Sequence, residues 1–262
     1  MVLIHPEYAL LIIEINDLKN DIANLIVEKD WLIYYVCKEL RIDYTLKIGS
    51  LEYKLFLIEK RYTKNLRKLE LLREAQKNKI DINIEKIEQK VNNEFKKMDE
   101  PEKEMLGDLD YAILMSSKEY FDDDLLEEMS DDYFKLQKMY NPIFDFSQDE
   151  ERKKTYKKIK KYYEKGNYKK LKKLAEDYDE NDIFQDEIEN LKIIKEKYLE
   201  IEEIYEKEIR KIRNSFPYNQ KSILEDENLC RRKKDKLNRQ IIETDIENRK
   251  IEKKIKNFLK KN

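Results

Sequence analysis

Apolar residues recur at intervals of three and four through most of this chain, the spacing that places them on one face of an α-helix. Near the start the series runs Leu11, Ile15, Leu18, Ile22 and Leu25. Glycine and proline, which make the turns of sheet-containing folds, number only 3 and 4 in 262 residues. The sequence therefore predicts an all-α fold, a helical bundle.

Breaks in this spacing divide the chain into expected helices. Residues 1–120 form a helical N-terminal region, with helices over about 6–30, 39–77 and 82–98 and a further one beginning at the Asp99-Glu100-Pro101 break. Asp81 is expected to cap the third of these helices. The most hydrophobic stretch, Trp31 to Cys37, is expected to be a buried helix or a turn between helices in the core.

Residues 180–262 predict two long helices, about 183–213 and 222–259, separated by a turn at 214–219. They are expected to form a long antiparallel coiled-coil hairpin. A helix of thirty residues spans about 45 Å, so the hairpin either packs back on the N-terminal helices or dimerises. Thr244 and Asn248 are polar interruptions of the second helix's apolar seam, a feature that can fix the register of paired helices.

Cysteine content and the character of the N-terminus predict a cytoplasmic protein, and charge says little about its partners. The chain has 55 basic and 57 acidic residues, so its overall field favours neither polyanions nor polycations. Cys37 and Cys230 are far apart in sequence and fit free thiols in a reducing compartment. The apolar N-terminus lacks the basic start of a signal peptide, and no run approaches the roughly 20 apolar residues that span a bilayer.

Patterns that carry enzyme chemistry are missing from the sequence. His5 is the single histidine, which argues against common zinc sites and against Ser-His-Asp or Cys-His catalysis. Gly49, Gly107 and Gly166 are isolated, so no phosphate-binding glycine loop is present. Acidic clusters lack the spacing and the glycine of an EF-hand. We expect no enzymatic activity, no metal and no cofactor.

The most informative segment runs from Tyr133 to Leu174. It reads as a helix ending near Tyr140, a loop with Asn141-Pro142-Ile143, a basic helix ending at Gly166, and a short fourth helix. Glycine is the expected stop of the basic helix. The tyrosines and isoleucine expected to pack that helix are Tyr156, Ile159, Tyr162 and Tyr163.

This order resembles the second half of a DnaJ-type J-domain, a helical hairpin followed by a short helix. The family carries His-Pro-Asp at the hairpin tip, which couples it to a DnaK-type chaperone ATPase. Asn141 aligns with that histidine, Pro142 with the proline and Ile143 with the aspartate. The flanking helices extend the resemblance to J-domain-containing proteins of low-GC bacteria, and the J-like module is placed at 121–179. The partner-binding loop that the resemblance implies is Asn141, Pro142, Ile143, Phe144, Asp145 and Phe146.

Two departures from the family affect the expected activity. Asn141 cannot carry charge and Ile143 replaces an anion, and losing a buried charge contact at an interface commonly costs about 2–5 kcal/mol, more than tenfold in affinity. The first hairpin helix, basic in the family, is acidic here. We therefore expect a degenerate module that does not stimulate a DnaK-type ATPase. The acidic residues are Asp122, Asp123, Asp124, Glu127, Glu128, Asp131 and Asp132.

The second hairpin helix and the short helix carry twelve basic residues between 152 and 173, with Glu164 the one acid among them. One interpretation is that the tyrosines between these residues are hairpin core and the lysines a solvated face, which could also pair with the acidic patch upstream. The other is a surface for nucleic acid, since clustered cations neutralise phosphates. The possible polyanion or partner patch comprises Arg152, Lys153, Lys157, Lys158, Lys161 and Lys165.

Three functions remain open at this point. The favoured hypothesis is a non-enzymatic adaptor or scaffold that acts through protein partners, either as a subunit of a larger complex or as a homodimer through the C-terminal hairpin. The second is a nucleic-acid-associated protein that uses residues 152–173. The third is a divergent but active DnaK co-chaperone.

Overall fold

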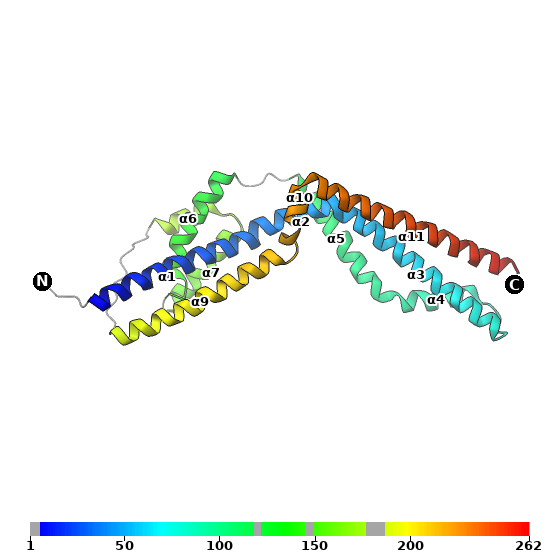
Figure 1. Cartoon of the computed structure of the whole chain (residues 1–262), viewed down its shortest axis with the longest axis horizontal. Helices are drawn as coiled ribbons and strands as arrows, with labels where there is room; N and C mark the ends of the chain where they lie inside the picture. Colours follow the sequence, from blue (N-terminus) through cyan, green and yellow to red (C-terminus); the bar gives the residue numbers. More distant parts are fainter. Residues whose placement is uncertain (1–5, 118–121, 145–148, 177–186, 262) are drawn as a thin grey trace. The chain divides into compact units, whose positions relative to one another are not determined.

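The computed structural model describes residues 6–117, 122–144, 149–176 and 187–261, and all regular structure within these ranges is helical (Figure 1). This confirms the all-α prediction. The long helices are α1 (Pro6–Trp31), α3 (Ser50–Lys77), α9 (Ile188–Asn214) and α11 (Glu227–Lys261).

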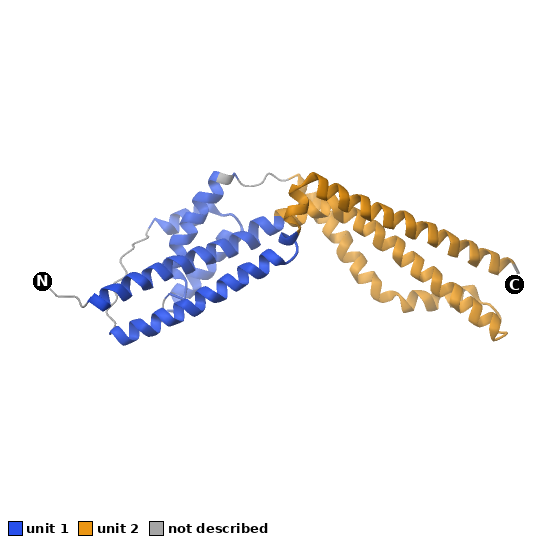
Figure 2. Cartoon of the chain, in the orientation of Figure 1, with its two compact units in different colours: residues 1–38, 119–219 blue, residues 39–118, 220–262 orange. Residues whose placement is uncertain are grey.

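The chain divides into two compact units, each built from two separate stretches of sequence (Figure 2). Unit 1 comprises Met1–Lys38 and Glu119–Asn219, and unit 2 comprises Glu39–Lys118 and Gln220–Asn262. This interleaved division differs from the three consecutive ranges expected from the sequence, 1–120, 121–179 and 180–262.

The expected C-terminal hairpin is replaced by two separate helix pairs. In unit 1, α9 packs along α1, and in unit 2, α11 packs along α3. Both pairs are parallel. In each pair, residues early in one helix contact residues early in the other, and late residues contact late residues. In unit 1 these contacts are Glu7–Lys192, Glu14–Lys195 and Glu28–Arg213, and in unit 2 they are Glu52–Lys233 and Asn65–Asn248.

The apolar stripes explain this difference. Each long helix carries one stripe, and a stripe specifies which face is buried but not which helix buries it. The first turns of α9 lie beside the start of α1, where Glu7 pairs with Lys192, so the two helices run in the same direction.

In unit 1 the helices α6 (Asp123–Tyr140), α7 (Glu150–Glu164) and α8 (Tyr168–Ala175) pack on one another, and α6 also packs on α1. Asp149 caps α7 by accepting a hydrogen bond from the Glu151 amide. Gly166 ends α7 as predicted, with φ of 63° and with its amide donating to the Tyr163 carbonyl. The core of these helices is Met129, Tyr133, Leu136, Ile159, Tyr163, Leu171 and Ala175, joined by Tyr35.

Tyr35 comes from the π-helical turn η1 (Leu32–Val36), which follows α1. Leu32 and Tyr35 are buried, whereas Trp31 and Ile33 are 38% and 40% exposed, so the expected burial of the stretch from Trp31 to Cys37 is confirmed only for its inner face.

Unit 2 begins within α2 (Cys37–Tyr44), which continues through the π-helical turn η2 (Thr45–Gly49) into α3. After α3 come α4 (Ile84–Glu94), the short η3 (Lys96–Met98) and α5 (Asp99–Ser116). Asn83, not Asp81, caps α4, and its side chain accepts from the Lys86 amide at 3.0 Å. The turn η4 (Tyr218–Gln220) and α10 (Lys221–Glu225) lead into α11.

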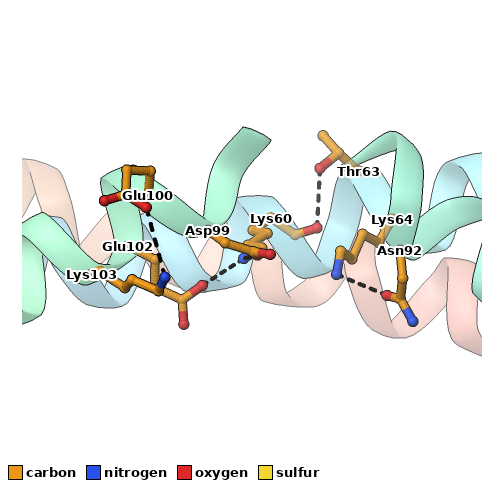
Figure 3. Close-up of polar contacts among 8 residues, drawn as sticks. All are labelled: Lys60, Thr63, Lys64, Asn92, Asp99, Glu100, Glu102 and Lys103. Carbon is orange, nitrogen blue, oxygen red and sulfur yellow. Dashed lines mark hydrogen bonds and ion pairs between the residues drawn. The ribbon is translucent and has the colours of Figure 1, made fainter. Parts of the chain in front are cut away.

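A buried lysine ties α3 to the start of α5 (Figure 3). Lys60 is 8% exposed, and its Nζ lies 2.6 Å from both Asp99 Oδ1 and Glu102 Oε2. Hydrogen bonding from Lys60 lowers the pKa of Asp99, and the two carboxylates raise the pKa of Lys60. Two carboxylates around one buried ammonium compensate its desolvation.

The seam between α3 and α11 contains a polar pair. Asn248 is 1% exposed, and the Asn65 amide donates to its side-chain oxygen at 2.8 Å. The sequence prediction of a polar residue in this seam is confirmed, although its partner helix is α3.

Candidate functional site

The loop that the sequence analysis predicts as a partner-binding site begins at Asn141, directly after α6. Asn141 ends the helix in an extended conformation, and the Phe144 amide donates to the Asn141 carbonyl at 3.0 Å to close a turn. The Ile143 amide also donates to the Asn141 side-chain oxygen at 3.1 Å. An asparagine side chain that binds the backbone two residues ahead stabilises a tight turn, which explains the need for this residue type.

Asn141 lies inside the unit, with 2% of its surface exposed. Its Nδ2 donates to Gln137 Oε1 at 2.8 Å and to the Tyr156 hydroxyl at 3.0 Å. Together with the bond from Ile143, these contacts engage both the donor and the acceptor of the amide. Burial raises the pKa of Tyr156, so its hydroxyl stays protonated within this network.

The rest of the described loop packs against the α1–α9 pair. Ile143 and Phe144 are half-buried against its core, and the Phe144 ring meets Tyr198 of α9 edge to face at 5.8 Å. Lys19 of α1 lies 5.8 Å from the centre of the Phe144 ring. Pro142 is half-buried. The loop is therefore held on both sides by its own unit. Asp145 and Phe146, also predicted for this site, lie outside the described residues.

A buried polar cluster anchors the helices below the loop. The Tyr133 hydroxyl donates to Asp30 Oδ2 at 2.7 Å, and the Tyr133 and Tyr163 rings stack 3.8 Å apart. The Tyr35 hydroxyl donates to the Tyr163 carbonyl. Burial, followed by the nearby Asp30 carboxylate, raises the pKa of Tyr133, and burial raises that of Tyr163 to about 12. Asp30 was not predicted from the sequence. The one signal for it was its position, as an acidic residue close to the end of the first apolar stripe.

The acidic patch of α6 is exposed at Asp124, Glu127, Glu128 and Asp131. It meets the basic residues at Glu128, which accepts a hydrogen bond from Tyr168 and lies 4.0 Å from Lys172. Among the described residues this is the one ion pair between the acidic patch and the basic helices. The two patches therefore meet at one point and do not neutralise each other along α7. The exposed lysines of α7 form a solvated face, as the first interpretation of the basic run expects.

The six predicted patch residues divide into two groups. Arg152 is half-buried and donates to the Met139 carbonyl, and Lys153 pairs with Glu150 at 3.0 Å, so both support the local fold. The other four are exposed and have no side-chain partner among the residues that the structure describes. They are Lys157, Lys158, Lys161 and Lys165.

A groove of about 590 Å³ lies between α3 and α11 in unit 2. Its floor is apolar, formed by Leu57, Ile58 and Ile241, and its rim carries Ile242 and Ile246, which are 58% and 48% exposed. The charged residues at its edges are Lys54, Arg61, Asp245 and Arg249.

Within the described ranges, no three His, Cys, Asp or Glu side chains cluster as metal ligands would. No helix in those ranges combines the length and apolar character needed to cross a bilayer. Both cysteines are free thiols, and burial raises the pKa of Cys37, which makes it a poor nucleophile.

Comparison of the chain with protein-family models, with curated proteins and with solved structures gives no match.

Proposed function

We propose that this chain is a non-enzymatic adaptor that acts through protein partners, with a degenerate J-domain-like module that has become a fixed part of unit 1. The observation that carries the proposal is the burial of Asn141 together with the full use of its side-chain amide inside the unit. A chaperone-coupling loop must present its side chains to a partner.

Engaging this loop from outside would require its release from α1 and α9. Release would expose Ile143 and Phe144. Presenting the Asn141 side chain to a partner would also break its hydrogen bonds to Gln137 of α6 and Tyr156 of α7. Each buried polar group left without a partner costs about 1–3 kcal/mol, and any coupling would be weakened by that amount. The loop is better suited to a structural role.

The groove between α3 and α11 supports a partner-binding role. Its two exposed isoleucines are spaced by four residues on α11 and lie beside apolar residues of α3. Two helices of this kind form a groove that suits the apolar face of a third helix. In the adaptor that we propose, a helical segment of the partner protein occupies this groove.

The first test is single-turnover ATPase stimulation of a DnaK-type chaperone, with a His-Pro-Asp-bearing J-domain protein as the positive control. We expect no stimulation by this chain. Stimulation that disappears in the Pro142→Ala variant would overturn the proposal and favour a divergent co-chaperone.

The second test identifies the partner by purification of the tagged chain from its host, followed by reconstitution with the purified candidate. We expect a stoichiometric complex that Ile242→Glu, Ile246→Glu disrupts. Ile193→Glu, Ile204→Glu is the matched control, because those isoleucines are exposed to a similar degree on α9 of unit 1. A complex that tolerates the groove variant, or no complex at all, would contradict the proposed groove.

A further inference from the structure

The outer face of α7 carries an uninterrupted stripe of lysines. Lys154, Lys157, Lys158, Lys161 and Lys165 are separated by threes and fours, so they share one face, opposite the buried Ile159 and Tyr163. All five are exposed, and none has an ion pair or hydrogen-bonded side-chain partner among the described residues. We call these five residues the lysine stripe.

The surrounding segment is strongly basic in a chain of nearly balanced charge. Between residues 150 and 176 there are twelve basic and four acidic residues, a net of eight positive charges, whereas the whole chain carries −2. Lys169 and Lys173 extend the exposed positive surface along α8. The charge is therefore concentrated on one part of unit 1.

Other helices of this chain are charged in a different way. On α9, Glu203 pairs with Lys207 and Glu206 with Arg210, each four residues apart. Such opposite pairs stabilise a helix, whereas like charges at the same spacing destabilise it. The five lysines of the stripe are neighbours of one another at these spacings, and the acids at the same spacing, Glu150, Glu151 and Glu164, lie near the two ends of α7. A face that weakens its own helix in this way is best explained by an anionic partner.

The chemistry around the stripe favours nucleic acid over other polyanions. Helices that bind a membrane surface need exposed apolar side chains to insert, and the large exposed apolar residues of the described chain include none on α7 or α8. From Lys154 to Lys165 the stripe runs for about 16 Å, the axial length of roughly five phosphates along one strand. A regular row of anions at that spacing matches a row of lysines better than an irregular acidic protein surface does.

We infer that the lysine stripe binds the phosphate backbone of nucleic acid without sequence preference. Lysine presents a compact point charge and lacks the planar fork with which arginine reads guanine, so backbone contact is the expected mode. This inference is independent of the proposed adaptor function, because the stripe lies on α7 and the proposed docking groove lies between α3 and α11.

The test is fluorescence anisotropy of the full chain with labelled DNA duplexes of about 20 base pairs in two unrelated sequences. We expect equal affinity for both, and about a 100-fold loss between about 50 and 200 mM salt if four phosphates are neutralised. Lys154→Gln, Lys157→Gln, Lys158→Gln, Lys161→Gln should weaken binding at least tenfold and leave the melting temperature equal or higher, since like-charge repulsion is removed.

The matched control removes four exposed charges elsewhere, in Lys236→Gln, Lys253→Gln, Lys254→Gln, Lys256→Gln on α11. This control should bind DNA as the wild type does. Absence of binding at low salt, or equal loss of affinity in both variants, would overturn the inference. Tighter stripe-dependent binding to polyglutamate or to phosphatidylserine vesicles than to DNA would overturn it in favour of an acidic protein or a membrane.

Discussion

The Tyr133 hydroxyl donates a 2.7 Å hydrogen bond to the carboxylate of Asp30, which lies 103 residues earlier in the chain and is 2% exposed. This contact joins α6 to the end of α1 and supplies a donor to a carboxylate that has almost no access to water. Burial of an ionised group is tolerated when hydrogen bonds replace its hydration. The pair therefore helps to hold α6 on α1.

Tyr133→Phe should destabilise unit 1 by about 1–3 kcal/mol, because the Asp30 carboxylate keeps its burial and loses its donor. Urea unfolding followed by the fluorescence of Trp31, the single tryptophan, measures this change. Tyr168→Phe is the matched control, since its hydroxyl also binds a carboxylate, Glu128, but at the surface. Equal effects of the two substitutions would contradict the importance of burial.

Asn141→Asp should destabilise unit 1 more than Asn141→Ala. Alanine removes the amide's bonds and should cost about 1–3 kcal/mol. Aspartate also buries an anion and loses the donor to Gln137 Oε1. The Ile143 amide and the Tyr156 hydroxyl can still donate to it, so the added cost is that of desolvating a hydrogen-bonded charge. The same unfolding assay separates the two variants. If Asn141→Asp were as stable as the wild type, the loop would not be locked as the hydrogen bonds indicate.

The sequence was sufficient for the fold class and for the ends of several helices. A period of 3.6 residues identifies the buried face of a helix. Gly166 ends α7 because glycine adopts a positive φ without strain. The sequence was not sufficient for the pairing of helices. Each of α1, α3, α9 and α11 carries an apolar stripe of the same helical period, so the choice of partner depends on side-chain complementarity along the whole contact.

For the candidate loop, too, the sequence predicts the local structure but not the tertiary contacts, as Asn141 shows. The residues at the tip between the two hairpin helices could be read from the sequence, but asparagine is usually exposed, and nothing local predicts that Asn141 is buried. Its burial depends on Gln137 and Tyr156, four residues before it and fifteen after it, which meet only when α6 and α7 pack. The signal that would have helped is the presence of these polar partners on the inner faces of both helices.

Acid should weaken unit 2 through Asp99. Hydrogen bonding from Lys60 lowers the pKa of Asp99 in the folded chain, so the unfolded chain binds more protons. Asp99 therefore contributes fully to the free energy of unfolding at pH values above its pKa in the unfolded chain, about 3.9. This contribution is lost as the pH falls through the lower pKa of Asp99 in the folded chain. Urea unfolding followed by far-UV circular dichroism at several pH values should show the wild type and Asp99→Asn converging at the acidic end.

Glu100→Gln serves as the control for this pH dependence. Glu100 pairs with Lys103 at 3.7 Å, and both side chains are about three-quarters exposed. Figure 3 shows this pair beside the Lys60 contact. Exposed pairs contribute little to stability, so this variant should follow the wild type at every pH. A constant difference between wild type and Asp99→Asn from neutral to acidic pH would contradict the role given to the Lys60 contact.

The Asn65–Asn248 pair should show strong coupling in a double-mutant cycle on unit 2. Asn248→Leu leaves the half-buried Asn65 amide without its 2.8 Å acceptor, and Asn65→Leu leaves the buried Asn248 oxygen without its donor, so each should destabilise by about 1–3 kcal/mol. Replacing both removes the two amides together, although Glu252, whose Oε1 accepts from both of them, then loses these donors. The double variant should therefore lose less stability than the sum of the two single losses. That pattern gives a coupling energy of about 0.5–3 kcal/mol in the same denaturation assay.

Simple additivity of the two losses would mean that the hydrogen bond does not link α3 to α11. A double variant with raised stability but faster amide exchange along α11 would show that the pair fixes the register of the two helices at a cost in stability, as polar residues do in coiled-coil seams.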